Sequence, residues 1–173
     1  MTSEKKIGMV TIGYLLAIAV LGRILFIIPN KRYLNILNIE DFYVTSCLVI
    51  FVCALLIYLF VKGSPIKKLL SLIVVSIIIF VGFAAYFYAS LPAYTYEAAV
   101  RKVETFETQS GKSVEVQIPE NREDKLGVGN SSYLKMTHYL YYIYLNVDGK
   151  PVSYRFNPLD GQFEMQTERR LIN

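Results

Sequence analysis

The sequence predicts a membrane protein in two parts. The first is a set of three transmembrane helices, and the second is a small α+β domain with one helix on an antiparallel sheet of about four strands. Long apolar segments fill the first 91 residues, whereas residues 92–173 show helical and then alternating apolar periodicity. Hydrophobic residues make up 54% of the 173 residues and charged residues only 18%, below the quarter or so that is typical of soluble domains.

Three apolar segments carry the prediction of membrane-spanning helices. They cover about residues 7–28, 44–61 and 69–90, and Arg23 is the only charged residue within them. A bilayer core is crossed by roughly 20 helical residues, and the segments lack the alternation of barrel strands. Since Arg23 lies five residues from Ile28, at the end of its span, we expect its side chain to extend toward the headgroups.

The distribution of charge predicts both the orientation and the partner of the basic residues. Residues 1–90 carry a net charge of +5 and residues 91–173 a net charge of −1, so the excess of basic charge belongs to the apolar half. This argues against nucleic acid and for the lipid bilayer as its partner. The lysines that flank the helices favour one side, which we expect to be cytoplasmic: Lys5, Lys6, Lys62, Lys67 and Lys68 against Lys31 and Arg32. The N-terminus is then cytoplasmic and residues 92–173 form an extracytoplasmic domain of a multi-pass cell-membrane protein.

The segment Pro29–Tyr43, between the first two apolar segments, is weakly amphipathic. It reads PNKRYLNILNIEDFY. Two interpretations stay open: a short helix on the membrane surface, or a plain connector.

After Pro92, the pattern predicts one helix. Thr95 is a candidate N-cap, and the stretch from Gln109 to Lys112 marks the end. One face carries an apolar stripe, which we expect to pack on the sheet: Tyr96, Ala99, Val100, Val103 and Phe106.

The remaining residues predict strands and turns. Val114, Val116 and Ile118 alternate with polar residues, and a polar loop over 120–132 follows. The run 134–147 changes its apolar face near His138, which predicts a bulge or a break there. Asp148-Gly149 and the stretch 157–161 are turn signals before two further strands, about 152–156 and 162–166. We expect Tyr139, Tyr141 and Tyr154 in the core, and Tyr142 and Tyr144 pointing outward.

This order of elements resembles the PepSY domain, a small α+β module of peptidase propeptides and of many bacterial membrane-anchored proteins. The similar parts are the helix whose sequence begins YTYEAAV at Tyr94, the strand SVEVQI, and the hairpin YLNVDGKPVSYRFNPLDGQF. Asn157 stands where the family commonly has an acid, and Gly161 takes the glycine position. The resemblance implies an extracytoplasmic module with protein-binding or peptidase-inhibiting roles, and it carries over no catalytic residue.

The sequence offers no catalytic, cofactor-binding or metal-binding constellation. It contains one histidine, and its two cysteines, Cys47 and Cys53, lie within an apolar segment. We therefore expect a protein that is not an enzyme and that binds a protein or peptide partner, or supports assembly or regulation at the cell envelope. Tyr142, Tyr144 and His138 are the candidate contact residues, since tyrosine gives contact area at little entropic cost. The alternative is that the helices carry the function, as a small subunit of a transporter or sensor complex or as an immunity protein against a membrane-active peptide.

Overall fold

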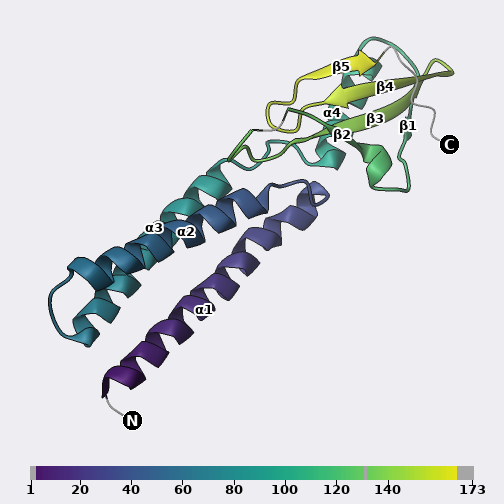
Figure 1. Cartoon of the computed structure of the whole chain (residues 1–173). Helices are drawn as coiled ribbons and strands as arrows, with labels where there is room; N and C mark the ends of the chain where they lie inside the picture. The colour runs from purple at the N-terminus through teal and green to yellow at the C-terminus, as the bar shows by residue number, and fades with distance from the viewer. Residues whose placement is uncertain (1–2, 131, 167–173) are drawn as a thin grey trace. The chain divides into compact units, whose positions relative to one another are not determined.

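The computed structural model describes residues 3–130 and 132–166, which fall into two compact units (Figure 1). The membrane unit consists of the first helix up to Pro29 together with Ile39–Ser90. The second unit, called the α+β domain below, consists of Asn30–Asn38 together with the described residues from Leu91 onward.

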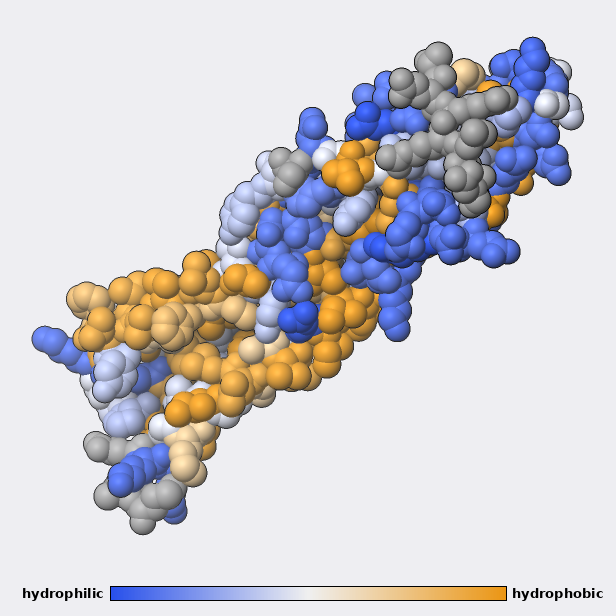
Figure 2. All heavy atoms as spheres, turned by 45° about the vertical axis from the view of Figure 1, so that its right-hand side comes forward, coloured by the Kyte–Doolittle hydropathy of each residue, from blue (hydrophilic) through white to orange (hydrophobic). Residues whose placement is uncertain are grey.

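Three helices form the membrane unit: α1 (Ser3–Asn30), α2 (Ile39–Phe60) and α3 (Pro65–Ala89). Each is long and apolar enough to cross a membrane, which confirms the predicted spans and makes the chain a multi-pass membrane protein. Apolar side chains cover the visible surface of these helices (Figure 2). Pro65 occupies the first turn of α3, where its missing N–H costs no hydrogen bond.

The helices of the membrane unit are joined by aromatic packing. The rings of Phe26 (α1), Phe42 (α2) and Phe87 (α3) are fully buried. Phe87 lies edge-on to the other two, with ring centroids 4.8 Å from Phe26 and 5.3 Å from Phe42. Polar contacts add to this packing. The Tyr14 hydroxyl lies 2.6 Å from Oγ of Ser76, and the Tyr88 hydroxyl donates to the backbone oxygen of Leu25 at 2.9 Å.

Arg23, the charge within the first span, has an acidic partner. Its guanidinium donates to Oε1 of Glu40 at 2.9 Å and lies 5.6 Å from the centre of the Tyr43 ring. Both charged side chains are more than half exposed. The exposed Arg23 side chain is compatible with the predicted extension toward the headgroups, and the structure adds an ion pair with Glu40.

The α+β domain contains one α-helix and five antiparallel strands, which confirms the predicted fold class. The elements are α4 (Tyr96–Gln109), β1 (Val114–Gln117), β2 (Leu126–Val128), β3 (Tyr139–Val147), β4 (Lys150–Phe156), β5 (Phe163–Gln166) and the short 3₁₀ helices η1 (Lys31–Tyr33) and η2 (Glu123–Lys125). The strand order is β1-β3-β4-β5, and β2 also pairs with β3. β2 was not predicted, because it is only three residues long and lies within the polar loop 120–132.

α4 begins and packs largely as its sequence predicts. The Thr95 hydroxyl oxygen accepts a hydrogen bond from the Ala98 N–H at 3.3 Å, which satisfies one free donor of the first turn. Its buried face meets a core formed by alternate residues of two strands: Tyr141, Ile143, Leu145, Tyr154 and Phe156. Two core predictions are wrong, since Phe106 is 52% exposed and Tyr139 is 38% exposed.

The turn between β3 and β4 follows from its sequence. Asp148 and Gly149 both have positive φ, 51° and 76°, as a type I′ hairpin turn requires. The Asp148 carboxylate also accepts from the Ser113 N–H at 2.9 Å, which fixes the start of β1 beside this turn.

The segment Asn30–Asn38 is an integral part of the α+β domain. Ile36 and Leu37 are buried, with 2% and 6% of their surface exposed. Leu37 forms an isolated antiparallel bridge with Thr137, and the Asn38 N–H donates to the backbone oxygen of Met136 at 2.8 Å. The segment is therefore neither a surface helix nor a plain connector.

A large-to-small change in this segment should destabilise the domain. We expect Ile36→Ala to lower the free energy of opening of the β3 amides by about 2–5 kcal/mol, because a nearly fully buried side chain is lost. Ile118→Ala removes the same atoms from a side chain that is 62% exposed and should change it by less than about 0.5 kcal/mol. Hydrogen exchange on the full chain in detergent measures both values, and equal effects of the two variants would contradict the assignment of the segment to this domain.

Candidate partner-binding surface

Tyr144, one of the three predicted contact residues, is not exposed. Only 8% of its surface is accessible, and its hydroxyl donates to the backbone oxygen of Asp124 in η2 at 3.1 Å. The prediction that Tyr144 points outward to solvent is wrong because η2, which the sequence did not reveal, lies beside the ring. Tyr144 thus anchors the segment between β1 and β2.

Tyr142 lies on the same sheet face as Tyr144 and is half-buried. Its ring rests on the backbone of Gly127 in β2, where an added Cβ would lie 2.7 Å from Cε2 of the ring. Glycine at 127 is what allows this close approach. Tyr142 leaves part of its ring accessible, and its role in contact with a partner stays a prediction.

His138, the third predicted residue, marks the break before β3 that the sequence indicates. β3 begins at Tyr139, and Nε2 of His138 lies 3.2 Å from Nδ2 of Asn38. Its Nδ1 is buried and has no hydrogen-bond partner in the part of the chain that the structure describes. His138 therefore belongs to the junction of Asn30–Asn38 with the sheet.

β1 and β2 act as one edge strand that is interrupted by residues 118–125. β1 pairs with β3 as far as Tyr144, and β2 resumes the pairing at Tyr141. Tyr142 and Ile143 face this interruption, and the Tyr96 hydroxyl donates to the backbone oxygen of Tyr142 at 3.2 Å. Burial raises the pKa of Tyr96, so its hydroxyl keeps its proton at neutral pH. Side chains and the excursion thus fill the gap between β1 and β2.

The opposite edge of the sheet is β5, and its backbone groups alternate in direction. The Asn157 N–H donates to the backbone oxygen of Gln162 at 2.8 Å, and Arg155 pairs with Glu164 along the same ladder. In an antiparallel ladder, the residues between such hydrogen-bonded pairs direct their N–H and C=O away from the partner strand. The backbone groups of Phe163 and Met165 therefore point away from β4, toward an edge on which no strand pairs within residues 3–130 and 132–166.

An apolar patch flanks this edge on the side of α4. It consists of Phe106, Phe163 and Met165, and is called the Phe106 patch below. Phe106 is 52% exposed and lies edge-on to Phe163, with 5.3 Å between ring centroids. Met165 is 54% exposed and lies on the helix side of β5, opposite Tyr154. The sequence placed Phe106 in the core because position 106 continues the stripe, but Glu107, four residues after Val103, takes the buried position instead.

The other side of β5 is mainly polar, with Leu140 and Phe163 among its residues. A shallow depression of about 310 Å³ is lined by Leu140, Arg155, Asn157, Gln162, Phe163 and Glu164. Arg155 and Glu164 form an ion pair across β4 and β5 at 3.7 Å. A strand placed along β5 would therefore meet apolar side chains on one face and polar side chains on the other.

Glu107 fixes the C-terminal part of α4, next to Phe106, onto the sheet. Its carboxylate is 2% exposed, accepts a 2.6 Å hydrogen bond from Nζ of Lys112, and accepts another from the Tyr154 hydroxyl. These bonds, that from Lys112 first, lower the pKa of Glu107 against the opposing effect of burial. Burial and the bond to Glu107 raise the pKa of Tyr154, which stays a donor.

Comparison with models of protein families, with curated proteins and with solved structures gave no match to this chain. The resemblance to the PepSY domain therefore stays a prediction. Among residues 3–130 and 132–166, no three His, Cys, Asp or Glu side chains gather as they would to hold a metal ion.

The Glu107 interactions predict a specific dependence of stability on pH. Because the folded-state pKa is lowered, the stabilisation is complete above the unfolded-state pKa of about 4.3 and is lost as pH falls through the folded-state value. We expect Glu107→Gln to lower the stability of the domain by about 1.5–3 kcal/mol at pH 7, with a smaller difference in acid. Glu115→Gln, on exposed β1, is the matched control. Hydrogen exchange of β4 amides between pH 7 and pH 3.5 measures this, and a difference independent of pH would contradict it.

Proposed function

We propose that the chain is a non-enzymatic, membrane-anchored binding protein. Its α+β domain lies outside the cytoplasm and takes an extended segment of a partner protein onto the free edge of β5. The observation that carries this proposal is the combination of backbone groups at Phe163 and Met165 that point away from β4 with the exposed Phe106 patch beside them. This combination matches strand addition, in which main-chain bonds give affinity and alternate side chains give specificity.

The chemistry of the two sides of β5 defines the segment that fits. Side chains on one face of the added strand would cover Phe106 and Met165, so these should be aliphatic or aromatic. Those on the other face would lie near Arg155 and Glu164, so these should be polar. An amphipathic strand with strict alternation is the expected ligand.

Further support comes from where the titratable groups with shifted pKa values lie. Glu107, Tyr96, Tyr141 and Tyr154 carry these shifts in the α+β domain, and all four are buried groups of its core. Tyr96, Glu107 and Tyr154 use their polar groups for hydrogen bonds within the domain, which favours binding over catalysis. The PepSY resemblance implies a role of the same class, at the envelope of a bacterial cell.

Strand addition predicts protection of particular amides. Peptides selected from a displayed random library against the full chain in detergent should alternate apolar and polar residues. When bound, they should slow hydrogen exchange at the Phe163 and Met165 amides, which become hydrogen-bonded. Slowed exchange at Leu126 and Val128 instead would place the binding site on the opposite edge and contradict the proposal.

Matched variants distinguish specific binding at the β5 edge from nonspecific binding to the surface of the domain. Met165→Pro removes an N–H that makes no bond to β4, and Phe106→Lys removes the apolar patch, so each should weaken binding about tenfold or more. Val128→Lys changes a side chain that is 80% exposed on β2 and should leave affinity unchanged. Equal losses in all three variants would overturn the assignment of the site.

The orientation in the membrane is tested by cysteine labelling. In a background where Cys47 and Cys53 are replaced by Ala, Ser132→Cys in the α+β domain should react with an impermeant maleimide on intact cells. Ser64→Cys, in the turn between α2 and α3, should react only after the membrane is opened, because the flanking lysines favour the cytoplasm. The reverse pattern would place the domain in the cytoplasm.

A further inference from the structure

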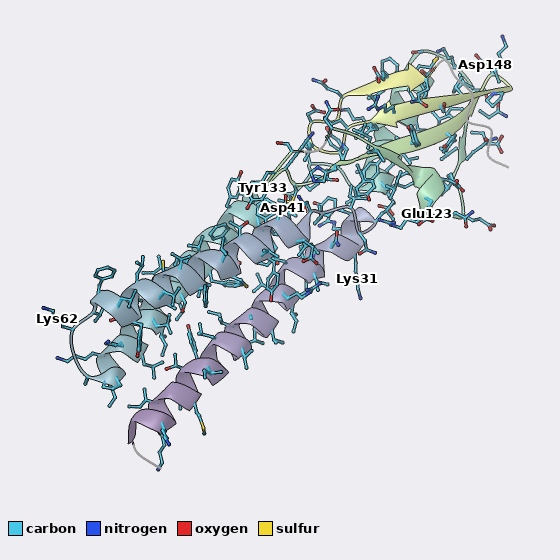
Figure 3. The ribbon with its side chains drawn as sticks, in the orientation of Figure 1. Lys31, Asp41, Lys62, Glu123, Tyr133 and Asp148 are labelled. Carbon is cyan, nitrogen blue, oxygen red and sulfur yellow. The ribbon has the colours of Figure 1, made fainter. Side chains whose placement is uncertain are left out.

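The membrane unit contains a cavity at the end where α1 begins and where α2 and α3 meet. Its volume is about 640 Å³, and Leu15, Ile57 and Leu72 provide apolar wall from each of the three helices. Tyr58 and Lys68 line the cavity near the turn that joins α2 to α3. Lys62 in this turn lies at the same end of the unit as the start of α1 (Figure 3).

Small residues on α1 leave the cavity open. Gly8 and Thr11 are three residues apart, so they share one face of the helix, and both line the cavity. A Cβ added at Gly8 would have nothing within 4 Å. At Gly22 the packing is close, because an added Cβ would lie 2.7 Å from the ring of Phe80. The α1 residues that line the cavity fall within residues 7–15, and a smaller space of about 250 Å³ follows beside Ile18 and Ala19.

The charge at this end of the membrane unit is strongly positive. Lys68 donates from Nζ to the backbone oxygen of Tyr58 at 2.8 Å, and this nitrogen lies 4.8 Å from the centre of the Tyr58 ring. An ammonium group has three donors, so that bond leaves two for a second ligand. Four more lysines flank the same helix ends: Lys5, Lys6, Lys62 and Lys67. The one acidic residue in these sequence segments is Glu4.

We propose that this cavity holds an acyl chain of an anionic phospholipid, whose phosphate faces Lys68. An apolar space of this volume, within the bilayer, is complementary to a lipid tail, and its wall residues regain the dispersion contacts that a void forfeits. Each basic side chain near an anionic headgroup adds about a fivefold preference, which favours an anionic over a zwitterionic lipid. This inference concerns the helices and does not depend on the function proposed for the α+β domain.

Native mass spectrometry of the full chain tests the site with two probes, phosphatidylglycerol and phosphatidylcholine with identical acyl chains. We expect saturable binding with a preference for phosphatidylglycerol. Lys68→Gln should weaken phosphatidylglycerol binding about fivefold and leave phosphatidylcholine unchanged, and Lys68→Arg should keep the preference. Lys31→Gln removes one charge at the opposite end of α1 and is the control.

A second pair of variants tests the cavity itself. Gly8→Leu places a side chain in the space and should weaken the binding of both lipids, whereas Gly13→Leu adds the same side chain to α1 outside the cavity lining. Equal binding of the two lipids by the wild type, or equal effects of the two leucine variants, overturns the proposal. So does a dimer that Gly8→Leu dissolves, which would show that a second copy fills the space.

Discussion

Arg122 donates from Nε to the backbone oxygen of Leu34 at 2.6 Å and from a terminal nitrogen to that of Asn35 at 3.1 Å, and the α+β domain depends on this connection. Leu34 and Asn35 both have positive φ, 55° and 56°. This conformation costs a non-glycine residue roughly 1–2 kcal/mol, and bonds from a charged donor offset such a cost. These bonds hold Asn30–Asn38, the loop between α1 and α2, in the α+β domain. The other residues of this domain begin at Leu91, about 50 positions after Asn38.

The same connection lies beside the edge of the sheet that β1 and β2 form. Arg122 lies in the excursion 118–125 that interrupts the β1–β2 edge, and the Tyr144 hydroxyl holds η2 from the sheet. The segment Asn30–Asn38 adds the bridge of Leu37 to Thr137 just before β3. The gap between β1 and β2 is thus filled from within the domain. At the other edge, the backbone groups of Phe163 and Met165 point away from β4, and the Phe106 patch lies beside them.

Sequence reasoning predicted what local patterns determine. The three spans, the N-cap at Thr95, the break near His138 and the turn at Asp148-Gly149 each follow from a few neighbouring residues, and all are present in the structure. The predictions that are wrong depend on contacts between distant segments. Tyr144 is buried beside η2, a one-turn element in a polar loop, and Phe106 is exposed because Glu107 takes the buried position next to it, bonded to Lys112 and Tyr154. The role of Asn30–Asn38 depends on partners about 90–100 residues away, which no periodicity encodes.

A single disulfide tests most directly whether Asn30–Asn38 belongs to the α+β domain. Residues opposite each other in an antiparallel pair have Cα atoms about 4.5–5.5 Å apart, within the range of a disulfide. With Cys47 and Cys53 replaced by Ala, the pair Leu37→Cys and Thr137→Cys should form a bond under mild oxidation, visible by mass mapping. The pair Leu37→Cys and Lys150→Cys, at the far end of the β3–β4 hairpin, should not. Failure of the first pair to cross-link, or equal cross-linking of both pairs, would contradict a domain built from two separate segments of the chain.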